Sequence, residues 1–142
     1  MEARISIITL GVADLEKSYQ FYKALGFSSS KTPVDGIVFF KMSGVCLALY
    51  PLEKLKADVS PDLNTNRSGF SGITLAHNTK TQQEVDVVLA LAKQAGGNIE
   101  KPAQDLFWGG YGGYFSDPDG YLWEVAYGEC WEFNDDGSLV VE

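Results

Sequence analysis

The sequence predicts an α+β fold in which two βαβββ modules follow one another along the chain. A strand-like segment at residues 6–10, Ser-Ile-Ile-Thr-Leu, recurs at residues 71–75 as Ser-Gly-Ile-Thr-Leu. An amphipathic helical pattern follows each copy. Strand-like segments then follow each helix, at residues 27–32, 36–42 and 45–50 in the first half and at residues 99–105, 111–116 and 121–127 in the second.

The ends of these elements carry recognisable signals. Asp14 is a good N-cap for the first helix, which Gly26 ends. Thr81 and Glu84 form a capping-box pattern at the start of the second helix, and residues 117–120, Asp-Pro-Asp-Gly, predict a tight turn between the last two strands. The helix faces expected to pack inward carry Leu15, Tyr19, Tyr22 and Leu25 in the first helix and Val85, Val88, Leu89 and Ala92 in the second.

We expect a single domain over residues 1–142. Module one covers about residues 1–53 and module two about residues 69–128, with a polar linker at about residues 54–68. A C-terminal tail at residues 129–142 carries Trp131, Phe133 and an apolar stretch at residues 139–141. Exposing these side chains is unfavourable, so we expect the tail to dock on the body or on a partner chain of a homodimer.

The composition excludes several partners. The formal net charge is −8, and the 11 Lys and Arg residues form no cluster, so we expect no nucleic-acid partner. No apolar run reaches the roughly 20 residues that span a bilayer, and the N-terminus has no signal-peptide pattern. We therefore expect a cytoplasmic protein with no membrane partner. Cys46 and Cys130 form no paired motif and are expected to be free thiols.

Two motifs carry a family resemblance. Residues 11–18, Gly-Val-Ala-Asp-Leu-Glu-Lys-Ser, lead to Phe21-Tyr22 and Leu25-Gly26-Phe27, and residues 113–120, Gly-Tyr-Phe-Ser-Asp-Pro-Asp-Gly, lead to Trp123-Glu124. In these motifs the chain resembles the vicinal oxygen chelate superfamily of glyoxalase I, bleomycin-resistance proteins and extradiol dioxygenases. The resemblance spans nearly the whole chain and implies a curved mixed sheet around a small-molecule cavity, the glyoxalase/bleomycin resistance fold.

The same resemblance implies four metal-ligand positions, on the first and last strand of each module, which fall at Ile7, Ala48, Gly72 and Glu124. Only Glu124 has a donor atom, and tight sites need three or four converging ligands. We therefore expect no metal or other cofactor, as in the metal-poor, bleomycin-resistance-like members, with a divalent metal as the alternative. A dioxygenase needs two imidazoles per iron, and His77 is the chain's one histidine, so that activity is not expected.

Four residues are candidates for ligand binding, namely Glu124, Trp108, Tyr111 and Tyr50. By strand alternation Glu124 shares its face with Leu122 and Ala126, while Trp123 points to the other side. Residues 107–113 interleave aromatic residues with glycines. This pattern is typical of a loop that approaches a ligand, and equally of glycines that relieve crowding in a twisted strand.

The preferred function is metal-independent binding of a small aromatic or amphipathic molecule, resembling the antibiotic-sequestering proteins of the superfamily. One alternative is a glyoxalase-like metal-dependent lyase or isomerase that uses Glu124 as its catalytic residue. Another is a non-catalytic oligomeric module with a collapsed cavity. Whether the protein is an enzyme stays open at this stage, with binding preferred over catalysis.

Overall fold

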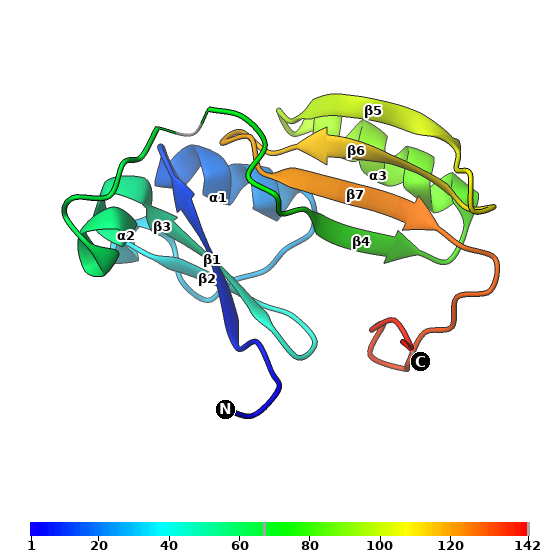
Figure 1. Ribbon diagram of the computed structural model, residues 1–142, viewed down its shortest axis with the longest axis horizontal. Coiled ribbons are helices and arrows are strands. Elements are labelled where there is room, and N and C mark those ends of the chain that lie inside the picture. Colours follow the sequence, from blue (N-terminus) through cyan, green and yellow to red (C-terminus); the bar gives the residue numbers. More distant parts are fainter. Residues whose placement is uncertain (67, 142) are drawn as a thin grey trace. The chain divides into compact units, whose positions relative to one another are not determined.

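The computed structural model describes residues 1–66 and 68–141, and these form two units, Met1–Ser71 and Gly72–Glu142. Each unit contains a mixed sheet with at least one helix beside it (Figure 1). The predicted α+β fold is therefore confirmed. Among the described residues, no helix combines the length and the apolar character that crossing a membrane requires.

The first unit contains a three-stranded sheet in the order β1-β3-β2. Strand β1 runs parallel to β3, and β2 runs antiparallel to β3. The elements are, in chain order, β1 (Ile7–Val12), α1 (Leu15–Ala24), the 3-10 helix η1 (Pro33–Asp35), β2 (Val38–Lys41), β3 (Cys46–Pro51) and α2 (Leu52–Val59).

Helix α1 begins as predicted, with the Asp14 carboxylate accepting a hydrogen bond from the Lys17 backbone N–H at 2.9 Å. Its buried face agrees with the prediction at Tyr22, but the other buried residues are Ser18 and Phe21. The other predicted residues of this face are half-buried. The Tyr22 ring packs edge-on against Phe27, with ring centroids 5.5 Å apart, and lies 5.8 Å from the Phe40 ring of β2. This aromatic cluster anchors the helix to the sheet.

The strand expected at residues 27–32 is absent from the described part of the first unit. Phe27 packs into the aromatic cluster, and at the other end the Thr32 N–H donates to the Asp35 carboxylate at 2.8 Å. Pro33 then starts η1 and has no N–H to offer to a neighbouring strand. The expected linker is also partly wrong, because helix α2 occupies its first residues and packs against β1 and β3.

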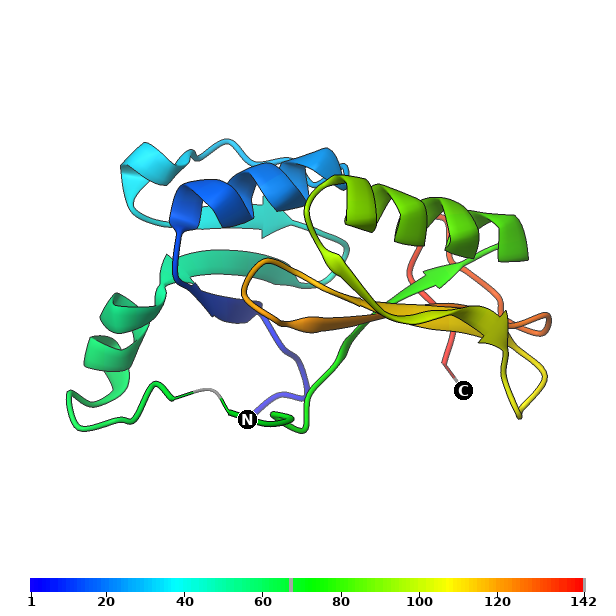
Figure 2. The same cartoon turned by 90° about the horizontal axis from the view of Figure 1, so that it is seen from above.

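The second unit contains a four-stranded sheet in the order β4-β7-β6-β5, and Figure 2 shows α3 along one face of it. Strand β4 is parallel to β7, and the other pairs are antiparallel. The elements are, in chain order, β4 (Leu75–Thr79), α3 (Gln82–Gln94), β5 (Asn98–Asp105), β6 (Tyr111–Ser116) and β7 (Leu122–Tyr127).

Helix α3 has the predicted capping box, in which Thr81 Oγ1 accepts from the Glu84 N–H at 3.2 Å and the Glu84 carboxylate accepts from the Thr81 N–H at 3.3 Å. Val85, Leu89 and Ala92 are buried, as the helical period predicts. Strand β4 starts at Leu75 and not at residue 71, and Gly72, with a left-handed φ of 79°, forms a bend ahead of it.

Candidate functional site

The two faces of the second sheet have different environments. A Cβ on Gly113 of β6 would come within 2.9 Å of Leu89 of α3, so this side of the strand faces the helix. Gly113 pairs with Val125, whereas Tyr114 pairs with Glu124. Since neighbouring residues of a strand point to opposite sides, Tyr114 and Glu124 lie on the face away from α3. We call this surface the Glu124 face.

The centre of the Glu124 face is a hydrogen-bonded pair. The Tyr114 hydroxyl donates to the Glu124 carboxylate, and both side chains are half-buried. Burial raises the pKa of Tyr114 above its ordinary value of 10.0, and the negative charge of Glu124 and the hydrogen bond raise it further. The tyrosine therefore stays protonated at neutral pH and holds the carboxylate in a fixed orientation.

Small residues surround this pair. Glu124 pairs with Ala76 on β4, and the next cross-strand pair on the same face is Gly112 with Ala126. A Cβ on Gly112 would lie 2.7 Å from the Val125 carbonyl oxygen and 3.0 Å from the Ala126 Cβ, so this position has no room for a side chain. Short side chains beside the pair leave its polar atoms accessible to a ligand.

A second carboxylate lies on the same face. Ser116, two residues beyond Tyr114 on β6, is almost fully buried, and its hydroxyl donates to Glu100 of β5 at 2.6 Å. Glu100 and Glu124 are thus both held by a hydroxyl donor from the same strand. Two oriented carboxylates give this face a negative potential that favours a cationic group.

The other predicted ligand residues have partners other than Glu124. The Tyr111 hydroxyl donates to Asp86 of α3 at 2.9 Å, which places this residue on the helix side of the sheet. Trp108 lies in the turn between β5 and β6, where it covers Gly110 and stacks on Trp131 of the tail. Tyr50 belongs to β3 of the first unit and pairs with Gly11.

The glycines of residues 107–113 have structural roles. Gly112 and Gly113 are buried in β6, and a Cβ on either would collide with backbone atoms of a neighbouring strand. Gly109 has a φ of 93°, as the turn after β5 requires. The pattern was compatible with a loop that approaches a ligand or with glycines that relieve crowding in a strand. The second interpretation accounts for Gly112 and Gly113.

The four implied metal-ligand positions do not fit a metal site. Ala48 is fully buried in β3, and Ile7 is 50% exposed at the start of β1. Gly72 lies before β4, and the residue that faces Glu124 on that strand, Ala76, has no donor atom either. Within the described part of the chain, no three His, Cys, Asp or Glu side chains come together as metal ligands.

His77 lies on the opposite side of the sheet from Glu124. It is in the middle of β4, where it pairs with Val125 of β7. A side chain on that side of the sheet does not join Glu124 in one site.

The structure contains a pocket that the sequence patterns do not predict. It has a volume of about 300 Å³ and lies in the second unit, at the ends of β4 and β7. The chain that follows β7 closes it, with Trp131 and Phe133 in its wall. The available signal was the spacing of aromatic residues at Tyr127, Trp131 and Phe133, but the wall also needs Lys80, which is distant in the sequence.

A family model described as Glyoxalase/Bleomycin resistance protein/Dioxygenase superfamily matches residues 4–125. A crystal structure of a glyoxalase-related enzyme from Fulvimarina pelagi is 35% identical, with a TM-score of 0.88 over 98% of each chain. Hypothetical protein SA1046 from S. aureus is 29% identical, with a TM-score of 0.75 over 90% of this chain and 95% of that one. Lactoylglutathione lyase from Agrobacterium tumefaciens shares the fold at 23% identity, with a TM-score of 0.64 over 92% of this chain and 98% of that one.

Proposed function

The chain belongs to the Glyoxalase/Bleomycin resistance protein/Dioxygenase superfamily, and on this basis we propose that it binds a small aromatic or amphipathic molecule without a metal. The ligand carries a cationic or hydrogen-bond-donating group that meets Glu124. This function resembles that of the antibiotic-sequestering members of the superfamily.

The observation that carries the proposal is the Tyr114–Glu124 pair. A carboxylate that already accepts one hydroxyl still has lone pairs for a second donor. The tyrosine fixes its orientation before the ligand arrives, which lowers the entropic cost of binding. The exposed Ala76 beside it offers apolar contact without steric hindrance.

Metal-dependent chemistry has little support from these residues. Ile7, Ala48 and Gly72 have no atoms that bind a cation, so a metal at the implied positions would have one carboxylate and water as ligands. We therefore derive no reaction step through a metal. The relative from Fulvimarina pelagi is described as a glyoxalase-related enzyme. The main alternative is therefore a lyase activity, and an experiment must distinguish it from ligand binding.

The test compares Glu124→Gln with the parent chain. Gln keeps the size of the side chain and removes its charge, so the Kd of a cationic planar dye such as proflavine should rise roughly tenfold. A neutral planar dye should lose much less affinity. Glu16→Gln, an exposed site on α1, is the matched control and should leave both Kd values unchanged.

Tyr114→Phe adds a second, independent variant. It removes the hydroxyl that orients Glu124 but keeps the ring, so it should weaken the cationic dye less than Glu124→Gln does. Equal affinity of parent and Glu124→Gln for every cationic dye that binds would contradict the proposal. Turnover of methylglyoxal–glutathione hemithioacetal that depends on added metal and on Glu124 would favour the lyase.

A further inference from the structure

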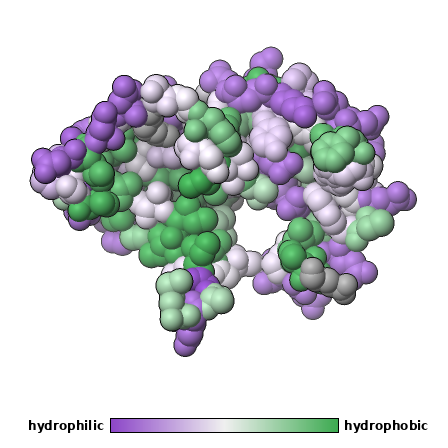
Figure 3. Space-filling view, viewed as in Figure 1, coloured by the Kyte–Doolittle hydropathy of each residue, from purple (hydrophilic) through white to green (hydrophobic). Residues whose placement is uncertain are grey.

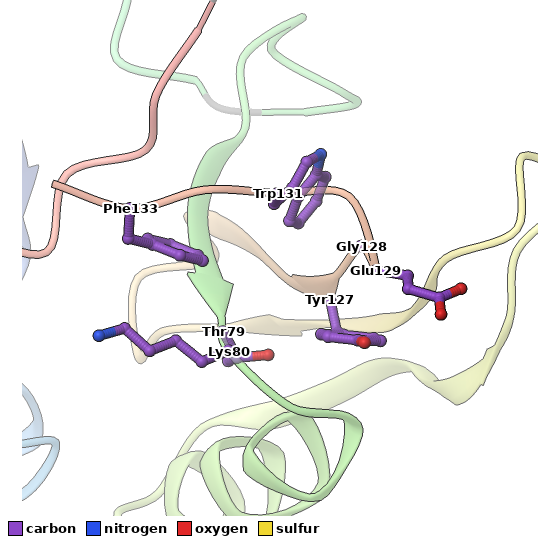
Figure 4. Close-up of a pocket in the computed structure, with 7 residues that line it drawn as sticks. All are labelled: Thr79, Lys80, Tyr127, Gly128, Glu129, Trp131 and Phe133. Carbon is purple, nitrogen blue, oxygen red and sulfur yellow. The ribbon is translucent and has the colours of Figure 1, made fainter.

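The pocket beyond β7 has aromatic walls. Tyr127 at the end of β7 and Trp131 and Phe133 in the segment after it contribute their rings, and Figure 4 shows these rings gathered around the pocket. Aromatic rings offer large contact areas to another flat ring, with few rotatable bonds to fix. A volume of about 300 Å³ is at the lower end of the range for ligand sites, so it suits a molecule of one or two rings.

The walls are held in place by the rest of the second unit. Trp131 stacks on Trp108, with ring centroids 5.5 Å apart and planes at 30°. A Cβ on Gly128 would come within 2.8 Å of the Trp131 ring, so this glycine allows the indole to lie flat on the backbone. The backbone N–H of Trp131 also donates to the Gly128 carbonyl at 3.1 Å. The pocket is therefore formed before a ligand binds.

The charges at the pocket select the ligand further. The Lys80 ammonium lies 5.7 Å from the centre of the Phe133 ring, and no described carboxylate forms an ion pair with it. The Lys80 backbone is fixed as well, because its N–H donates to Glu84 Oε2 at 2.7 Å. Glu129 also lines the pocket, but Figure 4 shows its carboxylate at the opposite end from the ammonium.

We propose that this pocket binds a small aromatic molecule with one anionic group, of the aryl carboxylate class. The ring lies among Tyr127, Trp131 and Phe133, and the carboxylate pairs with the Lys80 ammonium. Glu124 is not among the residues that line this pocket, and the pocket prefers the opposite ligand charge. Its occupation does not depend on the function proposed for Glu124.

The test follows the indole N–H signals of the full-length protein by NMR, each assigned with a Trp→Phe variant of one of the 3 tryptophans. Naphthoate is the probe, and naphthalenemethanol is its uncharged counterpart. Naphthoate should shift the Trp131 signal, and through the stack the Trp108 signal, in a saturable manner. The Trp123 signal should stay in place, since this residue packs on Phe115 in β6.

Lys80→Met keeps the aliphatic stem and removes the charge. It should weaken naphthoate about two- to fivefold, the size expected for an exposed ion pair, and leave naphthalenemethanol unchanged. Lys93→Met, another exposed lysine of the same unit, is the matched control and should change neither. Glu129→Gln should keep or improve naphthoate binding, because it removes a negative charge.

Several results would overturn the proposal. They are an unmoved Trp131 signal at saturating naphthoate, an equal loss for both probes in Lys80→Met, and loss of naphthoate binding in Glu129→Gln. Glu124→Gln should leave naphthoate binding intact. A failure of naphthoate to bind the pocket beyond β7 is therefore distinguishable from a failure of the function proposed for the Glu124 face.

Discussion

Tyr114 and Glu124 face each other across strands β6 and β7, and the tyrosine hydroxyl donates to the carboxylate. The pair couples a raised tyrosine pKa to an oriented negative charge on the side of the sheet away from α3. Each partner can be replaced by a residue of nearly the same size. The coupling can therefore be measured with little change in packing.

Glu124→Gln should lower the pKa of Tyr114, because it removes the negative charge that disfavours tyrosinate. The pKa should stay above 10.0, since burial is the largest cause of the shift. Ultraviolet absorbance of tyrosinate during an alkaline titration measures this change. Tyr114→Phe identifies the signal by removing it. A Tyr114 pKa that is the same in the parent and in Glu124→Gln would show that the two groups do not interact.

The same pair makes stability depend on alkaline pH. The folded pKa of Tyr114 is raised, so its contribution to the free energy of unfolding is fully present below pH 10.0 and is lost as the pH rises through the folded value. Tyr114→Phe should lose less stability over that range than the parent. Urea unfolding at a series of alkaline pH values gives the comparison. An identical pH dependence of the two proteins would count against the raised pKa.

Metal content gives a direct check on the implied ligand positions. After dialysis, we expect far less than one equivalent of zinc, nickel, iron or manganese per chain, because Ile7, Ala48 and Gly72 lack donor atoms. Elemental analysis of protein purified without chelator or added metal measures it. One tightly bound equivalent of any of these metals would contradict this expectation and favour the lyase.

Gly113→Ala should lower the free energy of unfolding by about 2 kcal/mol. Its Cβ would lie 2.5 Å from the Lys101 carbonyl oxygen and 2.9 Å from the Ala103 nitrogen, and backbone atoms of a strand cannot move aside easily. Gly11→Ala is the matched control, because its closest contact, at 2.7 Å, is the mobile Leu52 Cδ1. Urea unfolding should rank Gly113→Ala as clearly the more costly, and equal losses would contradict the reasoning.

Thr81→Ala removes the side-chain cap of α3 and should cost about 1 kcal/mol of stability. Thr81→Ser retains the accepting hydroxyl and should cost little. Thermal or urea unfolding of the two variants measures their stability. The comparison separates the effect of losing the capping hydroxyl from the effect of losing the methyl group. If Ser and Ala destabilise equally, the hydrogen bond to the Glu84 N–H is not the stabilising feature.

The tail should contribute to a homodimer, since Val140 is 39% and Val141 82% exposed. Deleting residues 129–142 is expected to shift sedimentation toward monomer or to cause aggregation. Substituting Val140 and Val141 by Asp leaves the Trp131–Trp108 stack in place and should still favour the monomer. Unchanged sedimentation of both variants would show that the tail does not contribute to a homodimer and only forms the pocket wall.

Local patterns in the sequence determined several features that the structure confirms. The N-cap at Asp14 and the capping box at Thr81 lie where they were predicted, because each involves residues within one helical turn. The turn at residues 117–120 is likewise local, with Asp117 Oδ1 accepting from the Tyr121 N–H at 2.9 Å and Gly120 at a φ of 86°. The family also followed from the motifs at residues 11–18 and 113–120, and the family model that matches residues 4–125 confirms it.

Tertiary structure decided the rest. Residues 27–32 have no strand partner, because Phe27 packs instead with Tyr22 and Phe40, and both of these contacts involve other elements. The separation of Tyr111 from Glu124 follows from strand register and from the hydrogen bond to Asp86, 25 residues away. The pocket beyond β7 is lined both by Lys80 and by residues of a segment that begins at Tyr127. Such features depend on which distant segments pack together, and short-range sequence patterns carry no information about that choice.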